Sequence, residues 1–140
     1  MVCLLLLLCV LPYVSCKLPQ STIHIWESIA EGHDLICADK FGIDKNLAKY
    51  HFRNLYLPDN RAFHCFLNCL YDRVGFIDEN GEFKYDVVVE KAHFLSDELA
   101  KRCIAESHQQ LDFCDRTYVG GLCAVSDLAG VDRSKLNVRN

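Results

Sequence analysis

The chain has 140 residues, of which 51% are hydrophobic and 24% charged, a composition typical of one folded globular domain and not of a disordered segment. Its 15 basic and 19 acidic residues give a formal net charge of −4, and the two signs are interleaved along the chain. Because binding to phosphates requires a basic stripe that displaces counterions, nucleic acids and anionic membrane surfaces are disfavoured as partners.

The first sixteen residues carry no charged side chain and contain one apolar run that is too short for a comfortable membrane span. Such a run at the N-terminus is typical of a cleaved signal peptide. We therefore expect a signal peptide over residues 1–16 and a secreted, extracellular single domain over residues 17–140, without stable membrane insertion. An uncleaved anchor and a bacterial lipoprotein signal at Val14-Ser15-Cys16 are alternatives; the second fits less well because Tyr13 replaces its usual leucine.

Apolar residues recur at helical spacing through the first half of the mature chain. A first helix is expected from about Ile23 to a stop at Gly42, and Asp44 is a suitable N-cap for a short second helix. The clearest helix follows Pro58-Asp59 and carries an apolar stripe at intervals of three and four residues, made of Phe63, Phe66, Leu67, Leu70 and Val74.

The second half of the chain continues this pattern. Asn80-Gly81 predicts a tight turn, since glycine readily adopts a positive φ, and Asp86 and Ser96 are suitable N-caps for the two helices that follow. A last helix is expected from Asp112 through Leu122. From about residue 126 we expect a polar, mobile C-terminal tail. The periodicity therefore predicts an all-α fold, and no convincing hairpin is found.

The cysteines indicate a disulfide framework. Three of the nine precede Lys17 and would leave with the signal peptide, and six remain, namely Cys37, Cys65, Cys69, Cys103, Cys114 and Cys123. An even number of thiols in an oxidising compartment, with no CxxC pair, favours three disulfides over a metal site. Cys65 and Cys69 are four residues apart on one predicted helix, too far apart to bond each other. That excludes 3 of the 15 possible pairings and leaves 12 open.

The spacing Cys37-x27-Cys65-x3-Cys69-x33-Cys103-x10-Cys114-x8-Cys123 resembles the six-cysteine signature of the insect odorant-binding and pheromone-binding proteins. Short segments around the cysteines, such as Cys65-Phe66-Leu67-Asn68-Cys69-Leu70 and Cys114-Asp115, are similar to the family in the same order. The resemblance covers roughly residues 21 to 125. It implies about six short helices around a central apolar cavity, a monomer or weak homodimer, and the bridges Cys37–Cys69, Cys65–Cys114 and Cys103–Cys123.

The resemblance also implies which side chains line the cavity. Position by position it nominates Leu67, Leu70, Val74, Tyr85, Val88, Val89, Ala92, Ser96, Leu99, Tyr118 and Val119. For each apolar member, ordinary core packing is the alternative. Tyr85, Ser96 and Tyr118 could donate a hydrogen bond to an alcohol, aldehyde or ester.

Two features depart from the family pattern. Many members carry a bulky aromatic residue five positions after the fifth cysteine, where this chain has Val119 followed by Gly120-Gly121. Each glycine weakens a helix by roughly 1 kcal/mol, and the pair is expected to leave room for a larger cavity. The C-terminus ends in charged residues, unlike the apolar tails that cover the pocket in some members, so a tail lid is not expected.

The function that the resemblance implies is an extracellular carrier that binds small hydrophobic ligands and delivers them to chemosensory receptors. A ligand scavenger in saliva, venom or reproductive fluid is the alternative with the same fold. A third hypothesis is a secreted phospholipase A2, suggested by His33-Asp34, but the expected calcium loop does not precede that pair. We predict no catalytic residue, cofactor or metal site. His64 and His93 are the histidines expected to be partly buried, where protonation between pH 7 and 5 would release ligand.

Overall fold

The computed structural model describes residues 17–139, so the predicted signal peptide lies outside the described residues. This part of the chain forms α1 (Gln20–Ala30), α2 (His33–Phe41), α3 (Lys45–Tyr50), α4 (Arg61–Arg73), α5 (Tyr85–Lys91), α6 (Asp97–Ser107), α7 (Phe113–Ala129) and α8 (Arg133–Leu136). The described residues contain no strand beyond one isolated antiparallel bridge between Ile77 and Phe83. The predicted all-α class is confirmed.

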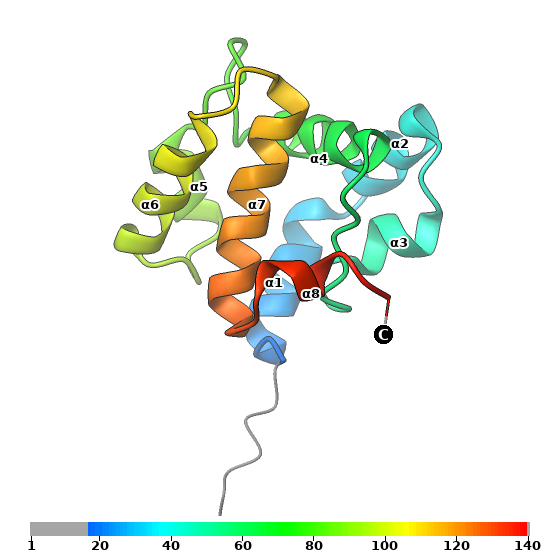
Figure 1. The fold of residues 1–140 in the computed structure, drawn as a ribbon, viewed down its shortest axis with the longest axis horizontal. Helices are drawn as coiled ribbons and strands as arrows, with labels where there is room; N and C mark the ends of the chain where they lie inside the picture. Colours follow the sequence, from blue (N-terminus) through cyan, green and yellow to red (C-terminus); the bar gives the residue numbers. More distant parts are fainter. Residues whose placement is uncertain (1–16, 140) are drawn as a thin grey trace, which may run out of the picture.

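Helix α7 lies at the centre of the molecule, with α4 on one side and the α5–α6 pair on the other (Figure 1). It packs against both α4 and α6, while α2 packs on α4 and α8 covers part of α7. Within residues 17–139 no helix combines the length and apolar character needed to cross a membrane.

Side-chain caps begin most of the predicted helices. The carboxylate of Asp44 accepts hydrogen bonds from the backbone N–H groups of Asn46 and Leu47, both at 3.0 Å. Ser96 and Asp112 cap α6 and α7 in the same way. The caps Asp44 and Ser96 are as predicted, and Asp112 caps the helix that was expected to start there. Each cap satisfies amide groups that have no partner inside the helix.

The structure corrects two helix boundaries. The first predicted helix is broken at Gly32, whose φ of +80° ends the helical conformation and starts α2 in a new direction. Apolar spacing continues on both sides of the break, so periodicity did not reveal it. The N-cap of α5 is Lys84, and Asp86 lies in the first turn of the helix instead. Its negative charge there still favours the positive end of the helix dipole.

Three disulfides hold the helices together, and they are the pairs that the resemblance implies. Cys37–Cys69 joins α2 to α4, Cys65–Cys114 joins α4 to α7, and Cys103–Cys123 joins α6 to α7. Since α4 and α7 each take part in two of the bridges, the framework fixes both neighbours of the central helix.

The segment after residue 126, where the sequence predicts a polar tail, contains the end of α7 and the short helix α8. Helix α7 continues to Ala129, because Val125 and Ala129 are one helical turn apart and both buried. Leu136 in α8 is only 1% exposed, and its carbonyl accepts a hydrogen bond of 2.7 Å from the backbone N–H of Leu57. A single leucine in a polar stretch gives no periodicity from which such packing could be predicted.

Candidate functional site

An almost entirely apolar cavity of about 70 Å³ lies between α7 and the helices around it. Helices α1, α4, α5, α6 and α7 contribute to its walls. The segments that follow α3, precede α5 and follow α5 contribute as well. Six of the lining residues are aromatic, namely Trp26, Phe52, Tyr71, Phe76, Phe83 and Phe94. Segments distant in sequence therefore meet at one apolar space.

Trp26 contacts three other aromatic rings in one wall of the cavity. Its ring centroid lies 5.6 Å from that of Phe52, 6.0 Å from that of Tyr71 and 6.4 Å from that of Phe76. The contact with Tyr71 is edge-to-face, with an interplanar angle of 84°. Such tilted and edge-to-face pairs are favourable arrangements of aromatic rings, so the rings of this wall stabilise one another.

Of the eleven residues nominated from the sequence, the structure places Leu67, Val88 and Ala92 at the cavity. The other apolar nominees lie elsewhere. Leu70 and Val74 are buried in the core away from the cavity, and Leu99 packs with the Cys103–Cys123 disulfide. Val89 and Val119 are half-buried and do not line it. A shared helix does not ensure a shared face, and the rotation of each helix is decided by its packing partners.

The three polar nominees also lie outside the cavity lining, and each has another contact. Ser96 caps α6 through a 3.1 Å bond from the N–H of Leu99. A hydrogen bond to Asp97 raises the pKa of Tyr85. The hydroxyl of Tyr118 lies 2.8 Å from Asn137 Oδ1, on the C-terminal segment.

Several lining residues were missed in the sequence. Trp26, His51, Phe52 and Leu57 come from segments that the nomination did not include. Tyr71 was within reach of the sequence argument, because it follows Leu67 by four residues on α4 and so shares its face.

The two adjacent glycines of α7 make room for aromatic side chains. A Cβ atom on Gly120 would lie 2.9 Å from the ring of Phe83, and one on Gly121 would lie 2.6 Å from the hydroxyl of Tyr71. Both glycines line the cavity, but the space next to them is filled by these two rings. The expectation that the pair leaves a larger cavity is therefore corrected, because the neighbouring rings occupy the volume that the missing side chains leave.

The buried histidine of the cavity wall is His51, which is 3% exposed. Its Nδ1 lies 2.9 Å from the carbonyl oxygen of Ala48, and its ring meets those of Trp26, Phe63 and Phe66 edge-to-face. Burial lowers the pKa of His51 from the ordinary value of 6.5, although the Ala48 bond opposes the shift.

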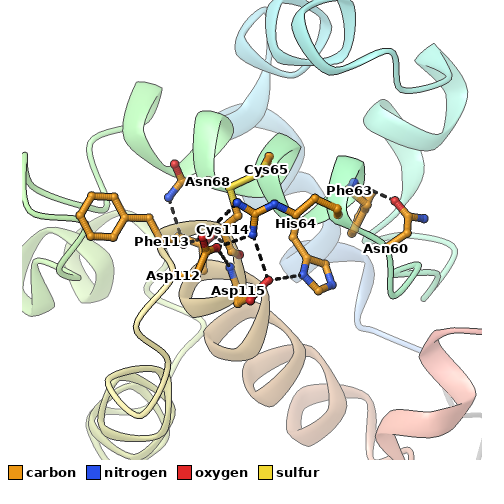
Figure 2. Close-up of a disulfide and its surroundings, with 11 residues drawn as sticks. Asn60, Phe63, His64, Cys65, Asn68, Asp112, Phe113, Cys114 and Asp115 are labelled. Atoms are coloured by element: carbon orange, nitrogen blue, oxygen red, sulfur yellow. Dashed lines mark hydrogen bonds and ion pairs between the residues drawn. A yellow bond between two sulfur atoms is a disulfide. The ribbon is translucent and has the colours of Figure 1, made fainter.

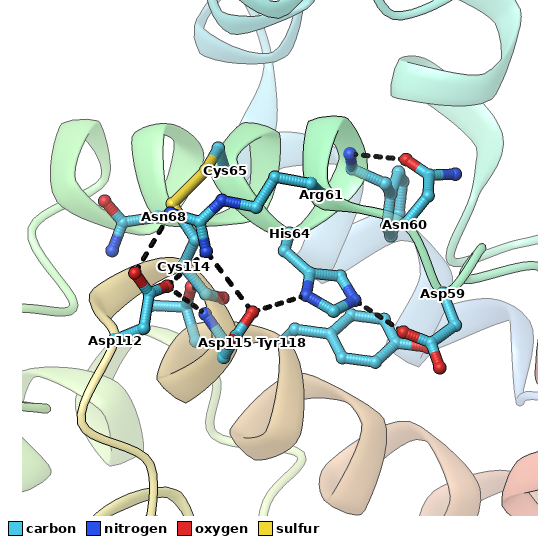
Figure 3. A network of polar contacts seen from close by, with 12 residues as sticks. Asp59, Asn60, Arg61, His64, Cys65, Asn68, Asp112, Cys114, Asp115 and Tyr118 are labelled. Carbon is cyan, nitrogen blue, oxygen red and sulfur yellow. Dashed lines mark hydrogen bonds and ion pairs between the residues drawn. A yellow bond between two sulfur atoms is a disulfide. The ribbon is translucent and has the colours of Figure 1, made fainter.

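The two histidines singled out in the sequence lie away from the cavity. His93 is exposed, which corrects the expectation that it is partly buried. His64 is half-buried, with its two ring nitrogens 2.8 Å from Asp115 and 2.9 Å from Asp59 (Figure 3). Its ring stacks on Tyr118 with a centroid separation of 3.8 Å. His64 therefore belongs to the polar contact between α4 and α7.

That polar contact surrounds the Cys65–Cys114 disulfide. Arg61 pairs with Asp112 at 2.5 Å, which lowers the pKa of Asp112 to about 2 (Figure 3). On the other side, the amide of Asn68 donates a 3.2 Å hydrogen bond to the carbonyl of Phe113 (Figure 2). The start of α7 is thus fixed to α4 by several independent contacts, at some distance along α7 from the glycines of the cavity wall.

One of the comparisons with known proteins identifies a family for this chain. The model of the PBP/GOBP family matches residues 26–127, a segment that contains all six bridged cysteines and most of the cavity lining. No curated protein and no solved structure matches the chain. PBP/GOBP is a family of binding and carrier proteins and not of enzymes. Since the match covers well over half of the sequence, the chain belongs to the PBP/GOBP family, the six-cysteine type of small-ligand carrier.

Proposed function

We propose that the protein is an extracellular carrier that holds one small hydrophobic molecule in the cavity between α7 and its neighbours, and delivers it to chemosensory receptors. The observation that carries the proposal is the cavity itself, an apolar space lined by aromatic and aliphatic side chains inside a shell of helices fixed by three disulfides. Such a lining binds ligands by removing their apolar surface from water, at about 25 cal/mol per Å².

The volume of the cavity limits what fits without movement. At about 70 Å³ it is smaller than the roughly 150 Å³ of an engineered cavity that accepts benzene. An odorant-sized ligand must therefore displace side chains, and half-buried lining residues such as Phe94, Leu95 and Leu128 can move outward. The work of opening offsets part of the gain from burial, which supports affinity on the order of micromolar.

The extracellular location rests on the apolar N-terminal run and on three disulfides, which form and persist in oxidising compartments. The tissue in which the protein is expressed tests the proposed delivery to receptors. Expression in chemosensory organs supports it, whereas expression confined to salivary, venom or reproductive glands assigns the same cavity to ligand scavenging.

Two adjacent valines of α5 provide a matched test of the cavity. Val88 is buried and lines the cavity, whereas Val89 is half-buried and does not. We expect Val88→Trp to fill the space and abolish binding of the fluorescent probe N-phenyl-1-naphthylamine, and Val89→Trp to leave it within about twofold of wild type. Fluorescence titration of residues 17–140 measures both affinities.

Melting temperature and circular dichroism accompany the titration, because an overpacked core costs about 1 to 3 kcal/mol. Val88→Phe is the milder variant if the tryptophan variant does not fold. Binding that survives both folded Val88 variants, or that is lost equally in Val89→Trp, places the ligand elsewhere and overturns the proposal.

A further inference from the structure

Tyr71 lines the cavity, and its hydroxyl makes no hydrogen bond to another group among residues 17–139. Tyr71 is 9% exposed, lines the cavity, and has its pKa raised by burial alone, with no hydrogen bond contributing. Tyr118, the other tyrosine that is buried within residues 17–139, has the carbonyl oxygen of Leu57 and Asn137 Oδ1 within 3.1 Å. The hydroxyl of Tyr118 is thus satisfied within the protein, whereas the hydroxyl of Tyr71 keeps its capacity to donate and accept a hydrogen bond at the cavity.

The surroundings fix where this hydroxyl lies. The ring of Tyr71 is held edge-to-face by Trp26 and by Phe83, with centroid separations of 6.0 and 5.9 Å. Its oxygen lies against Gly121 of α7, so close that any Cβ atom there would be 2.6 Å away. Gly121 also lines the cavity, so the hydroxyl borders the space that a ligand would occupy.

We infer that the Tyr71 hydroxyl donates a hydrogen bond to an oxygen atom of the bound ligand, so that the cavity selects carbonyl, ester or ether compounds over hydrocarbons of the same shape. The inference rests on the proposed carrier function and names its ligand class. The ligand oxygen supplies the partner that the protein lacks, while the rest of the ligand meets the aromatic walls. Gly121 is then required because any larger residue would push the hydroxyl away.

Benzaldehyde and styrene test the inference, since they have the same shape and differ only in a carbonyl oxygen that replaces a terminal carbon. Displacement of N-phenyl-1-naphthylamine gives the ratio of the two Kd values in wild type and in Tyr71→Phe. We expect the preference for benzaldehyde to fall about fivefold in the variant, the factor of a typical net hydrogen bond. The different hydration of the two compounds is the same for both proteins and cancels from the comparison.

Tyr118→Phe is the matched control, because it removes a buried hydroxyl outside the cavity that has partners. We expect it to lower the melting temperature and keep the preference, and Tyr71→Phe to lower the preference without lowering the melting temperature. Gly121→Ala, whose Cβ would displace the hydroxyl, should also lose the preference. The carbonyl stretching band of bound benzaldehyde should shift to higher frequency in Tyr71→Phe.

The outcomes separate this inference from the carrier proposal. If the probe and styrene bind but Tyr71→Phe keeps the full preference for benzaldehyde, another donor such as the indole of Trp26 carries the selectivity and the role of Tyr71 is overturned. A fall in melting temperature equal to that of Tyr118→Phe, with no change in preference, assigns the hydroxyl to the fold. If neither the probe nor either compound binds wild type, the carrier proposal fails and this inference with it.

Discussion

His51 is an ionisable side chain in the wall of the cavity. Its imidazole is enclosed by Trp26, Phe63 and Phe66, and one nitrogen is engaged by the carbonyl of Ala48. Burial is the largest influence on it and lowers the pKa, while the nearby carboxylate of Asp34 acts in the opposite direction. The neutral form is therefore the one that the folded protein accommodates, and a proton on His51 would place a charge beside aromatic rings.

The sign of the pH dependence follows from this shift. Between the lowered pKa of the folded state and the ordinary value of 6.5, the unfolded chain binds the proton more readily. The free energy of unfolding should therefore decrease as the pH falls below about 6.5, with a slope of at most about 1.4 kcal/mol per pH unit from this group. Urea denaturation between pH 5 and 7.5 measures the free energy of unfolding of wild type and of His51→Phe. The part of the pH dependence that comes from His51 should be absent in the variant.

His93→Asn is the control for the His51 experiment, because His93 is exposed and lies outside the cavity lining. It should keep the wild-type slope. A slope in His51→Phe as steep as that of wild type would assign the pH dependence to other groups.

At the scale of the helices, capping residues predicted the helix starts better than apolar periodicity predicted where a helix breaks. The N-caps Asp44 and Ser96 are properties of three or four neighbouring residues and could be predicted from the sequence, as could the start of α7 near Asp112. The break at Gly32 could not, because glycine is tolerated inside a helical pattern and only packing decides whether the chain turns there.

The cavity lining was harder to predict for the same reason. Leu67, Val88 and Ala92 line the cavity because they are buried on, or directly after, helices that the nomination included. Leu70 and Val74 share the apolar stripe of α4 with Leu67, yet they face the packed core. Whether a stripe residue meets another helix or an open space depends on what lies across from it, which the sequence of one helix does not contain.

Asp112 combines two roles at the start of the central helix, and substitutions can separate them. It accepts a 3.0 Å hydrogen bond from the N–H of Asp115 as the N-cap of α7, and it pairs with Arg61 of α4. Asparagine caps a helix as well as aspartate does. We therefore expect Asp112→Ala to lower the free energy of unfolding by about 1 kcal/mol or more, and Asp112→Asn by less, since an exposed ion pair contributes about 1 kcal/mol at most.

Thermal denaturation at neutral pH orders the two Asp112 variants. Since the Arg61 pair lowers the pKa of Asp112 to about 2 from 3.8, the contribution of the ion pair is present above about pH 3.8 and is lost as the pH falls towards 2. The advantage of wild type over Asp112→Asn should disappear in that window. Equal destabilisation by both variants would mean that the ion pair, and not the cap, stabilises this end of α7.

At the scale of the whole molecule, the three disulfides act on different parts of the fold. Cys65–Cys114 closes a loop with a sequence separation of 49 residues. It lies at the N-terminal end of α7, where Arg61 and Asn68 also connect α4 to α7. Cys103–Cys123 closes a separation of only 20 residues, but it fixes α6 to α7, and Cys103 itself lines the cavity. Stability and ligand binding should therefore depend on different bridges.

Replacing both cysteines of one bridge by alanine tests this division. In the loop-entropy description, loss of Cys65–Cys114 should cost about 4 kcal/mol and loss of Cys103–Cys123 about 3 kcal/mol. We expect the reverse order for binding of N-phenyl-1-naphthylamine, because without Cys103–Cys123 the α6 wall can move away from α7 and the ligand loses packing on one side. Measurements below the melting temperature of both variants, with urea stability determined alongside, compare folded proteins only. If affinity falls in proportion to stability in both variants, the cavity is not held by the α6–α7 bridge but by the cooperative packing of the whole core.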